Sequence, residues 1–385
     1  MSRPARCLPF GLVRGLALGT ALLGPVTTTG RAEAEDHATP TTKPVAKNKA
    51  MKAADLVSIS EVAFGHERFA TAHALHGQQG VALWEQPNQA HTQPTLWLSL
   101  PTLPEGPGHL ALSPDGNWLL VVGAASGGTL LLVNTRTGAT QAELTGRFAT
   151  LAWSRDGKWF AAAGQDQAAP PPGARTHPDK AVSYSTAGRI RIYAAASANE
   201  ASSVLLGPEQ EIVSVAFVAE RRVIGLYKEG ALASFVLKDE QNGKPQKTVD
   251  LYGRGHALAV SPDGRQIATV LTKESGESRV ELLDAATLAR TGTLEGGPKG
   301  PIQLSYSSDG AQLAVVGFGG VQVWDLKTAT LRATLDEGAH PRGAMFMRHG
   351  LVVVGGEQAL WQLYDHDLKK IRVTVGPPRL INAPS

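Results

Sequence analysis

Between about residues 57 and 375, short apolar runs alternate with clusters of polar turn residues. Four of these turns share one pattern, in which serine is followed by a variable residue, aspartate and glycine. They occupy residues 113–116, 154–157, 261–264 and 307–310. The first lies between the apolar runs 110–112 and 118–122. Serine suits the first position of a type I turn and glycine the last, so each copy predicts a β-hairpin.

The same order of residues continues after the hairpins. A third predicted strand ends in a large residue followed by an acid or an amide, and a polar turn and a fourth strand complete the unit. The pairs are Trp84-Glu85, Val133-Asn134, Leu283-Asp284, Trp324-Asp325 and Tyr364-Asp365. Each unit therefore predicts a four-stranded antiparallel sheet.

Weaker turns at residues 65–68, 218–221 and 347–350 raise the number of units to seven. The turns follow one another at intervals of 48, 41, 64, 43, 46 and 40 residues. All but the third interval match the ~40–45 residues of a propeller blade. Seven copies of one unit favour a single closed ring over two domains. The sequence thus predicts an all-β fold, one seven-bladed β-propeller of four-stranded antiparallel blades over residues 57–375.

The repeats resemble those of the WD-repeat family and its bacterial relatives with YVTN-type blades. The four turns and the pair Trp324-Asp325 are the residues that show this. The repeats are degenerate, because the dipeptides Gly108-His109 and Gly255-His256 lie closer to their turns than the family's Gly-His does. The resemblance implies blades held mainly by packing. It also implies that loops joining second to third strands share a face with the connections between blades, a face the family uses for binding.

The way the ring closes is also predicted. Blade 1 begins with an inner strand near residues 59–64, and blade 7 has four strands of its own, ending at 372–375. We therefore expect the ring to close by face packing, without a strand borrowed from the N-terminal segment.

The first 34 residues have the pattern of a signal peptide. Arg3, Arg6 and Arg14 are followed by a short apolar stretch, 15–23, and Ala34 ends a small-x-small cleavage site. The stretch is too short for the ~20 residues of a spanning helix, which argues against the alternative of an N-terminal membrane anchor. We expect an exported protein, periplasmic or secreted, with no membrane span after cleavage. A flexible polar linker (35–56) and a C-terminal tail (376–385) flank the propeller.

The net charge of the chain changes when residues 1–34 are left out of the count. The chain has 37 basic and 34 acidic residues, of which residues 1–34 hold four and one. The remainder has 33 of each and no net charge, so generic nucleic-acid binding lacks an electrostatic basis.

Candidate chemistry is sparse. Cys7, the only cysteine, lies in the leader, which excludes a disulfide, a thiolate metal site or a cysteine nucleophile after cleavage. We expect no cofactor and no metal, since neither His73 with His76 nor the group 365–367 has a recognisable ligand pattern. The repeated aspartates are interpreted as turn residues, without a catalytic role.

Two groups are candidates for a binding face. The long third interval contains an insertion in blade 3, residues 165–187, with Arg175, His177 and Tyr184. Loops of this length are commonly functional or disordered. A second group of cations precedes the inner strands of four blades. These are Arg147, Arg254, Lys299 and Arg342.

The four cations have two interpretations. They form a collar around the channel for an anionic ligand or an acidic partner loop, since guanidinium groups grip carboxylates. Alternatively they pair with acids in neighbouring loops, which the usual weakness of exposed charges favours. The acids are Glu105, Glu209, Glu211, Asp336 and Glu337.

Together these features favour an exported, non-enzymatic, monomeric propeller that serves as a protein-interaction or ligand-binding scaffold, with another protein as partner. The alternative is an enzyme with its site in the central channel, such as a lactonase-like hydrolase. A dinucleotide- or quinone-dependent dehydrogenase has no cofactor motif to support it.

Overall fold

The computed structural model describes residues 59–65, 67–75, 78–85, 93–100, 102–103, 105–124, 128–167, 186–208, 211–220, 222–236, 245–335, 340–355 and 361–374. Every regular element in these ranges is a β-strand. Within them, no helix is long and apolar enough to cross a membrane. The proposed signal peptide, linker and C-terminal tail lie outside the described residues and stay predictions.

The strands fall into seven consecutive groups of four. Blade 1 contains β1 (Ile59–Phe64), β2 (Arg68–Leu75), β3 (Gln78–Glu85) and β4 (Leu96–Ser99). Blade 2 contains β5 (Pro107–Leu112), β6 (Trp118–Gly123), β7 (Thr129–Asn134) and β8 (Thr140–Thr145). Blade 3 contains β9 (Arg147–Trp153), β10 (Trp159–Gln167), β11 (Thr186–Ala194) and β12 (Glu200–Pro208).

The remaining blades repeat this order. Blade 4 contains β13 (Ile212–Ala219), β14 (Arg222–Tyr227), β15 (Ala231–Val236) and β16 (Lys247–Asp250). Blade 5 contains β17 (Arg254–Val260), β18 (Gln266–Thr272), β19 (Ser278–Asp284) and β20 (Arg290–Gly297). Blade 6 contains β21 (Lys299–Tyr306), β22 (Gln312–Phe318), β23 (Gly320–Asp325) and β24 (Thr330–Leu335). Blade 7 contains β25 (Pro341–Met347), β26 (Gly350–Gly355), β27 (Trp361–Tyr364) and β28 (Lys370–Thr374).

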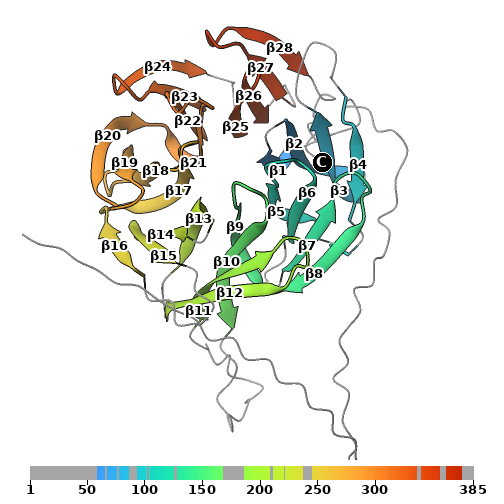
Figure 1. Ribbon diagram of the computed structural model, residues 1–385. Coiled ribbons are helices and arrows are strands. Elements are labelled where there is room, and N and C mark those ends of the chain that lie inside the picture. Colours follow the sequence, from blue (N-terminus) through green and yellow to red (C-terminus); the bar gives the residue numbers. More distant parts are fainter. Residues whose placement is uncertain are drawn as a thin grey trace, which may run out of the picture. The chain divides into compact units, whose positions relative to one another are not determined.

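Each blade is an antiparallel sheet whose strands lie in sequence order. The first strand of each sheet lies innermost, next to the first strands of both neighbouring blades, and the ring closes where β25 meets β1 (Figure 1). The prediction of a seven-bladed propeller is therefore confirmed. Closure also follows the prediction, because β1 pairs with β2 inside blade 1 and blade 7 contains β25 to β28 alone.

The four serine–aspartate–glycine turns are closed by one set of hydrogen bonds. In the first turn the Ser113 hydroxyl donates to Asp115 Oδ1 at 2.6 Å, and the Trp118 N–H donates to Ser113 Oγ at 2.9 Å. The other three turns repeat both contacts. Gly116 has φ of 70°, a conformation that glycine adopts without strain. The aspartates thus hold their own turns, as the sequence predicted.

The core lies between neighbouring blades. At the closing seam, Phe69 and Trp84 of blade 1 stack with ring centroids 5.6 Å apart, and Trp361 of blade 7 meets both rings edge-on. Phe69 and Trp361 are at most 1% exposed. Aromatic pairs of this geometry contribute about 0.5–1.5 kcal/mol beyond the burial of their apolar area. Packing of this kind closes the ring without a shared strand.

Blade 1 also contains a buried polar contact chain. The Trp84 indole donates to Thr71 Oγ1 at 2.8 Å, and Thr71 Oγ1 lies 2.6 Å from His73 Nε2. The histidine comes from β2 itself, two residues from the threonine. His73 is thereby accounted for as a core residue of blade 1.

Candidate functional site

The register of blade 3 defines the two faces of the propeller. Gln165 pairs with Arg147, the first residue of β9, and also with Gly188 of β11. The start of an inner strand therefore lies at the same end of its blade as the connection from the second to the third strand. We call this end, where β10 leads to β11, the insertion-bearing face. The opposite end, with the turns 113–116, 154–157, 261–264 and 307–310, is the turn face.

Each inner strand has a β-bulge near its start, on the insertion-bearing face. The unpaired residues are Ser60, Gly108, Ala149, Val213, His256 and Arg342, and in β21 they are residues 300–302. A bulge bends a strand and redirects its side chains, and bulges are frequent next to functional sites. The bulge is repeated around the ring, and the sequence pattern did not predict it.

The four predicted cations lie at these bulged strand starts. Arg147, Arg254 and Lys299 are the first residues of β9, β17 and β21, and Arg342 is the bulged residue of β25. Arg254, Lys299 and Arg342 are exposed, and Arg147 is partly buried. The predicted residues Arg175, His177 and Tyr184 lie outside the described residues.

None of the four cations forms an ion pair with another described residue. Of the acids considered as their partners, Glu211 instead binds Lys228, with Nζ 2.5 Å from Oε2. Glu209, Asp336 and Glu337 lie outside the described residues. Within the described part of the chain, the positive charge of Arg147, Arg254 and Lys299 is therefore available to a ligand or partner, whereas that of Arg342 also acts on Glu61.

Exposed apolar side chains join the cations on blades 5, 6 and 7. Tyr252, Phe318 and Ile302 are 75%, 58% and 41% exposed. Phe318 ends β22 opposite Lys299, and its ring meets the His340 ring edge-on with centroids 5.4 Å apart. We call this group the aromatic–cationic surface. Its members are Tyr252, Arg254, Lys299, Ile302, Phe318, His340 and Arg342.

The apolar members were missed by sequence reasoning, although one signal was present. Phe318 is followed by two glycines in a tight turn, a position where a large apolar side chain has no core to enter. The other two large apolar side chains that stand exposed in the described ranges, Leu331 and Ile371, are on the outermost strands β24 and β28. Only the fold shows which exposed residues share a face.

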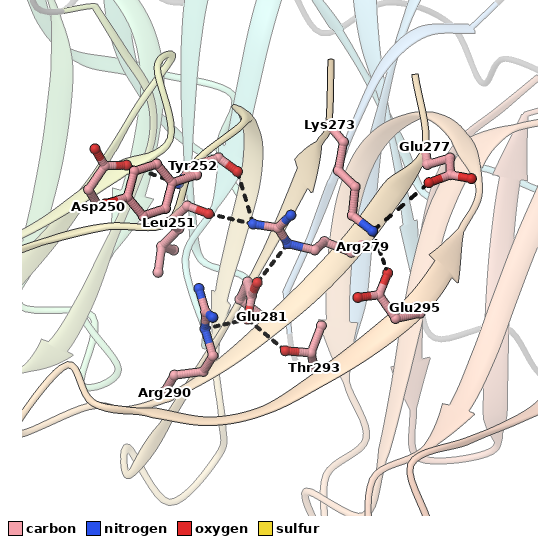
Figure 2. A network of polar contacts seen from close by, with 10 residues as sticks. All are labelled: Asp250, Leu251, Tyr252, Lys273, Glu277, Arg279, Glu281, Arg290, Thr293 and Glu295. Atoms are coloured by element: carbon pink, nitrogen blue, oxygen red, sulfur yellow. Dashed lines mark hydrogen bonds and ion pairs between the residues drawn. The ribbon is translucent and has the colours of Figure 1, made fainter. Parts of the chain in front are cut away.

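Tyr252 is held in a strained backbone conformation. Its φ is 54°, in the left-handed region that tyrosine rarely adopts. Asp250 Oδ1 accepts its N–H at 2.9 Å, and Arg279 Nη2 donates to its carbonyl at 2.9 Å (Figure 2). Strain of this kind persists where surrounding contacts fix it, and it clusters at functional sites. The exposed ring is thus presented by a rigid connection.

The support for Tyr252 is a buried ionic network in blade 5. The Glu281 side chain is 2% exposed and contacts Arg279 Nε at 2.6 Å and Arg290 Nε at 2.8 Å. Thr293 donates to the same carboxylate at 2.9 Å, and Arg279 also binds the Leu251 carbonyl (Figure 2). Because its charge and both of its carboxylate oxygens are partnered, we interpret Glu281 as structural.

Three other titratable groups occupy the bulged ends of inner strands. Burial raises the pKa of Glu61 from its ordinary 4.5 to about 7, against the opposing charge of Arg342. Loss of bulk water lowers the pKa of His109, and the same cause, with the charge of Arg254, lowers the pKa of His256. Perturbed pKa values are common at functional sites but also occur in structural ones.

The groups considered as metal ligands are explained by the fold. Asp365 Oδ1 accepts the N–H groups of Asp367 and Lys369 at 2.9 and 2.8 Å, which closes the turn before β28. His76 lies outside the described residues. In the part of the chain that the structure describes, no group of three or more histidine, cysteine, aspartate or glutamate side chains is arranged to hold a metal ion.

Comparisons with known proteins support the architecture. A chain of the mitotic checkpoint complex superposes with a TM-score of 0.59 at 14% identity, covering 84% of this chain and 96% of that one. A chain of the hydrazine synthase of Kuenenia stuttgartiensis gives a TM-score of 0.57 at 12% identity, covering 78% and 93%. In all, 1614 chains of solved structures match. At these identities the likeness establishes the propeller fold alone, which hosts many functions.

No protein-family model matches the chain. No curated protein matches it either.

Proposed function

We propose that this chain is a non-enzymatic interaction scaffold of the WD-repeat type, which binds an acidic, apolar-containing segment of another protein through its insertion-bearing face. The observation that supports this most is the aromatic–cationic surface. Exposed tyrosine and phenylalanine next to arginine is the composition that protein interfaces favour. Unneutralised guanidinium and ammonium groups beside those rings select carboxylates in the partner.

A neighbour in the mitotic checkpoint complex is in keeping with this function. That propeller is part of a multi-protein assembly, and a propeller with protein partners is the role we assign here by analogy of fold. The partner of the present chain is defined by chemistry only: carboxylates spaced to meet Arg254, Lys299 and Arg342, with an apolar side chain to cover Phe318.

The test is capture of partners from the exported fraction of the source organism on immobilised wild-type protein and variants. One variant carries Arg254→Ala, Lys299→Ala and Arg342→Ala, and a second carries Phe318→Ala. The matched control, Leu331→Ala with Ile371→Ala, removes equally exposed apolar side chains from the outer strands. We expect a protein that wild type and control retain, that salt elutes and that both surface variants lose. Equal retention by all four proteins would refute the proposal.

The blade 3 insertion is tested separately. Gln167 pairs directly with Thr186, so residues 168–185 can be replaced by a two-residue turn without breaking the β10–β11 register. We expect this deletion to weaken capture of the same partner, because the insertion leaves the blade on the binding face. Undiminished capture would restrict the partner to blades 5 to 7.

Export is a further part of the proposal and rests on the pattern of residues 1–34. We expect the protein to be recovered outside the cytoplasm with Glu35 as its first residue. Mass spectrometry of the N-terminal peptide decides this, and recovery of an intact N-terminus from the cytoplasm would contradict it.

One observation favours the alternative of a channel-site hydrolase. Glu61 has a pKa near neutrality, as a general base or acid requires, and Arg342 lies close enough to influence it. A panel of lactones incubated with wild type and Glu61→Gln tests this directly. Hydrolysis by wild type that the variant loses would support the enzyme, and absence of turnover in both would favour the scaffold.

A further inference from the structure

A pocket of about 490 Å³ opens on the insertion-bearing face between blades 2, 3 and 4. It is formed by the starts of three successive inner strands. The side chains that matter below are His109 of β5, Arg147 and Phe148 of β9, and Glu211 and Ile212 at the start of β13. The volume lies within the range of small-molecule sites. The pocket shares no residue with the aromatic–cationic surface.

Among the described residues the pocket lining carries one cation, Arg147, and one anion, Glu211, and Lys228 next to the lining brings the local net charge to plus one. Arg147 has no ion-pair partner among the described residues, whereas the charge of Glu211 is balanced by Lys228, with Nζ 2.5 Å from Oε2. The His109 side chain lines the pocket and is exposed at its rim; partial loss of bulk water lowers its pKa below the ordinary value, so it is neutral near pH 7. A neutral imidazole offers one donor and one acceptor without adding charge.

The other walls are apolar and closely packed. Val122, Phe148 and Ile212 are 2%, 7% and 3% exposed, so their side chains are fixed in place. Gly164 contacts the inner strand so closely that a Cβ atom would lie 1.7 Å from the Arg147 carbonyl oxygen. Glycine at this position therefore lets β10 approach β9 and fixes the backbone from which Arg147 projects.

We propose that this pocket binds a small monocarboxylate with a compact apolar body. The Arg147 guanidinium accepts the carboxylate through its paired N–H donors. His109 supplies a hydrogen bond beside it, and the apolar body lies against Phe148 and Ile212. A single cation fits one carboxylate better than a doubly charged phosphate, which prefers several donors or cations. The site is independent of the proposed partner surface on blades 5 to 7.

The experiment is calorimetric titration of the full chain with butyrate, hexanoate and phenylacetate, and with butyramide and butylamine as isosteric probes. We expect saturable binding of the carboxylates. The affinity for the amide and the amine should be lower by roughly tenfold or more, because only a carboxylate pairs with the guanidinium. Carboxylate binding no tighter than that of butyramide, or no binding by any of the probes, would overturn the proposal.

Variants localise the site. Arg147→Gln should reduce carboxylate affinity by roughly tenfold or more, and Arg147→Lys should restore only part of it, because lysine keeps the charge without the planar fork. Arg348 is the control cation, since it is exposed in the turn between β25 and β26, away from the pocket and outside the aromatic–cationic surface. Arg348→Gln should leave carboxylate binding unchanged.

Equal loss in the Arg147 and Arg348 variants would show a diffuse electrostatic effect and refute a built site. Thermal unfolding of each variant without ligand establishes that it is folded. If Arg147→Gln fails to fold, Ala149→Glu, at an exposed position of the pocket lining, places a negative charge in the pocket and should abolish carboxylate binding in its stead. Retained affinity in that variant would also refute the proposal.

Discussion

The charged side chains considered on the turn face are hydrogen-bonded within the blade, whereas the cations of the aromatic–cationic surface on the insertion-bearing face have no ion-pair partner among the described residues. On the turn face, hydrogen bonds from the Ser261 hydroxyl and the Arg265 N–H lower the pKa of Asp263, and Asp309 is held in the same way by Ser307. On the insertion-bearing face, Arg254, Lys299 and Arg342 have no ion-pair partner among the described residues. The turn aspartates thus accept hydrogen bonds that hold their hairpins closed, whereas these three cations form no ion pair with the described residues.

The buried network of blade 5 is an extreme case of a fully partnered charge, and it gives the largest expected effect. Glu281→Gln should reduce the free energy of unfolding by about 3 kcal/mol, because Arg279 keeps a nearly buried charge without its counter-ion. Urea denaturation measures this. Glu277→Gln removes an exposed carboxylate of a separate blade 5 ion pair, 3.9 Å from Lys273, and should cost less than about 0.5 kcal/mol. Similar losses in both variants would contradict the comparison.

On the insertion-bearing face, the Glu61 carboxylate is expected to lower the free energy of unfolding when it is ionised. Its pKa rises from 4.5 to about 7 on folding. Between these values the folded protein keeps the proton and the unfolded chain releases it, so stability falls as the pH rises through this window. Glu61→Gln should therefore be more stable than wild type by up to about 3 kcal/mol at pH 8, and nearly equal to it at pH 4.

Urea titrations of both proteins at the two pH values measure this difference. A variant that is less stable than wild type at pH 8 would show that the ionised carboxylate is stabilised by its surroundings. Arg342 would then be its partner.

A single turn gives a smaller effect. Ser261→Ala removes a donor to Asp263 Oδ1 at 2.6 Å and an acceptor for the Gln266 N–H at 2.9 Å. We expect a loss of about 1 kcal/mol in the free energy of unfolding, with unchanged partner capture. Ser308 is exposed at the second position of the last turn, and Ser308→Ala should change stability by less than about 0.5 kcal/mol. Equal losses in the free energy of unfolding for Ser261→Ala and Ser308→Ala would contradict a structural role of the Ser261 hydroxyl.

The smallest expected change in stability belongs to the aromatic–cationic surface. Arg254→Ala and Phe318→Ala should each change the free energy of unfolding by less than about 0.5 kcal/mol, since exposed side chains with few fixed contacts contribute little. The same variants should lose the captured partner. A destabilisation above about 2 kcal/mol in either would instead assign that side chain to the fold and remove it from the proposed interface.

The sequence located part of the candidate site. It placed Arg147, Arg254, Lys299 and Arg342 before inner strands, because a turn at known distance fixes where the next strand starts. It did not find Tyr252 or Phe318 as surface residues, since an aromatic residue in a strand-rich chain is most often core. Nor did it resolve whether the cations pair with nearby acids, which depends on side-chain distances across loops.

The sequence by itself determined the seven blades and their strand order, because hairpins form between residues close along the chain and their turns have a local signature. It favoured closure by face packing, and the pairing of β1 with β2 decided this. The tertiary structure decided which side chains share a face, which charges stay without partners and where inner strands enclose a pocket. These depend on contacts between blades some 40 residues apart. Packing and electrostatics decide these contacts between residues far apart in the sequence, and a local sequence pattern does not predict them.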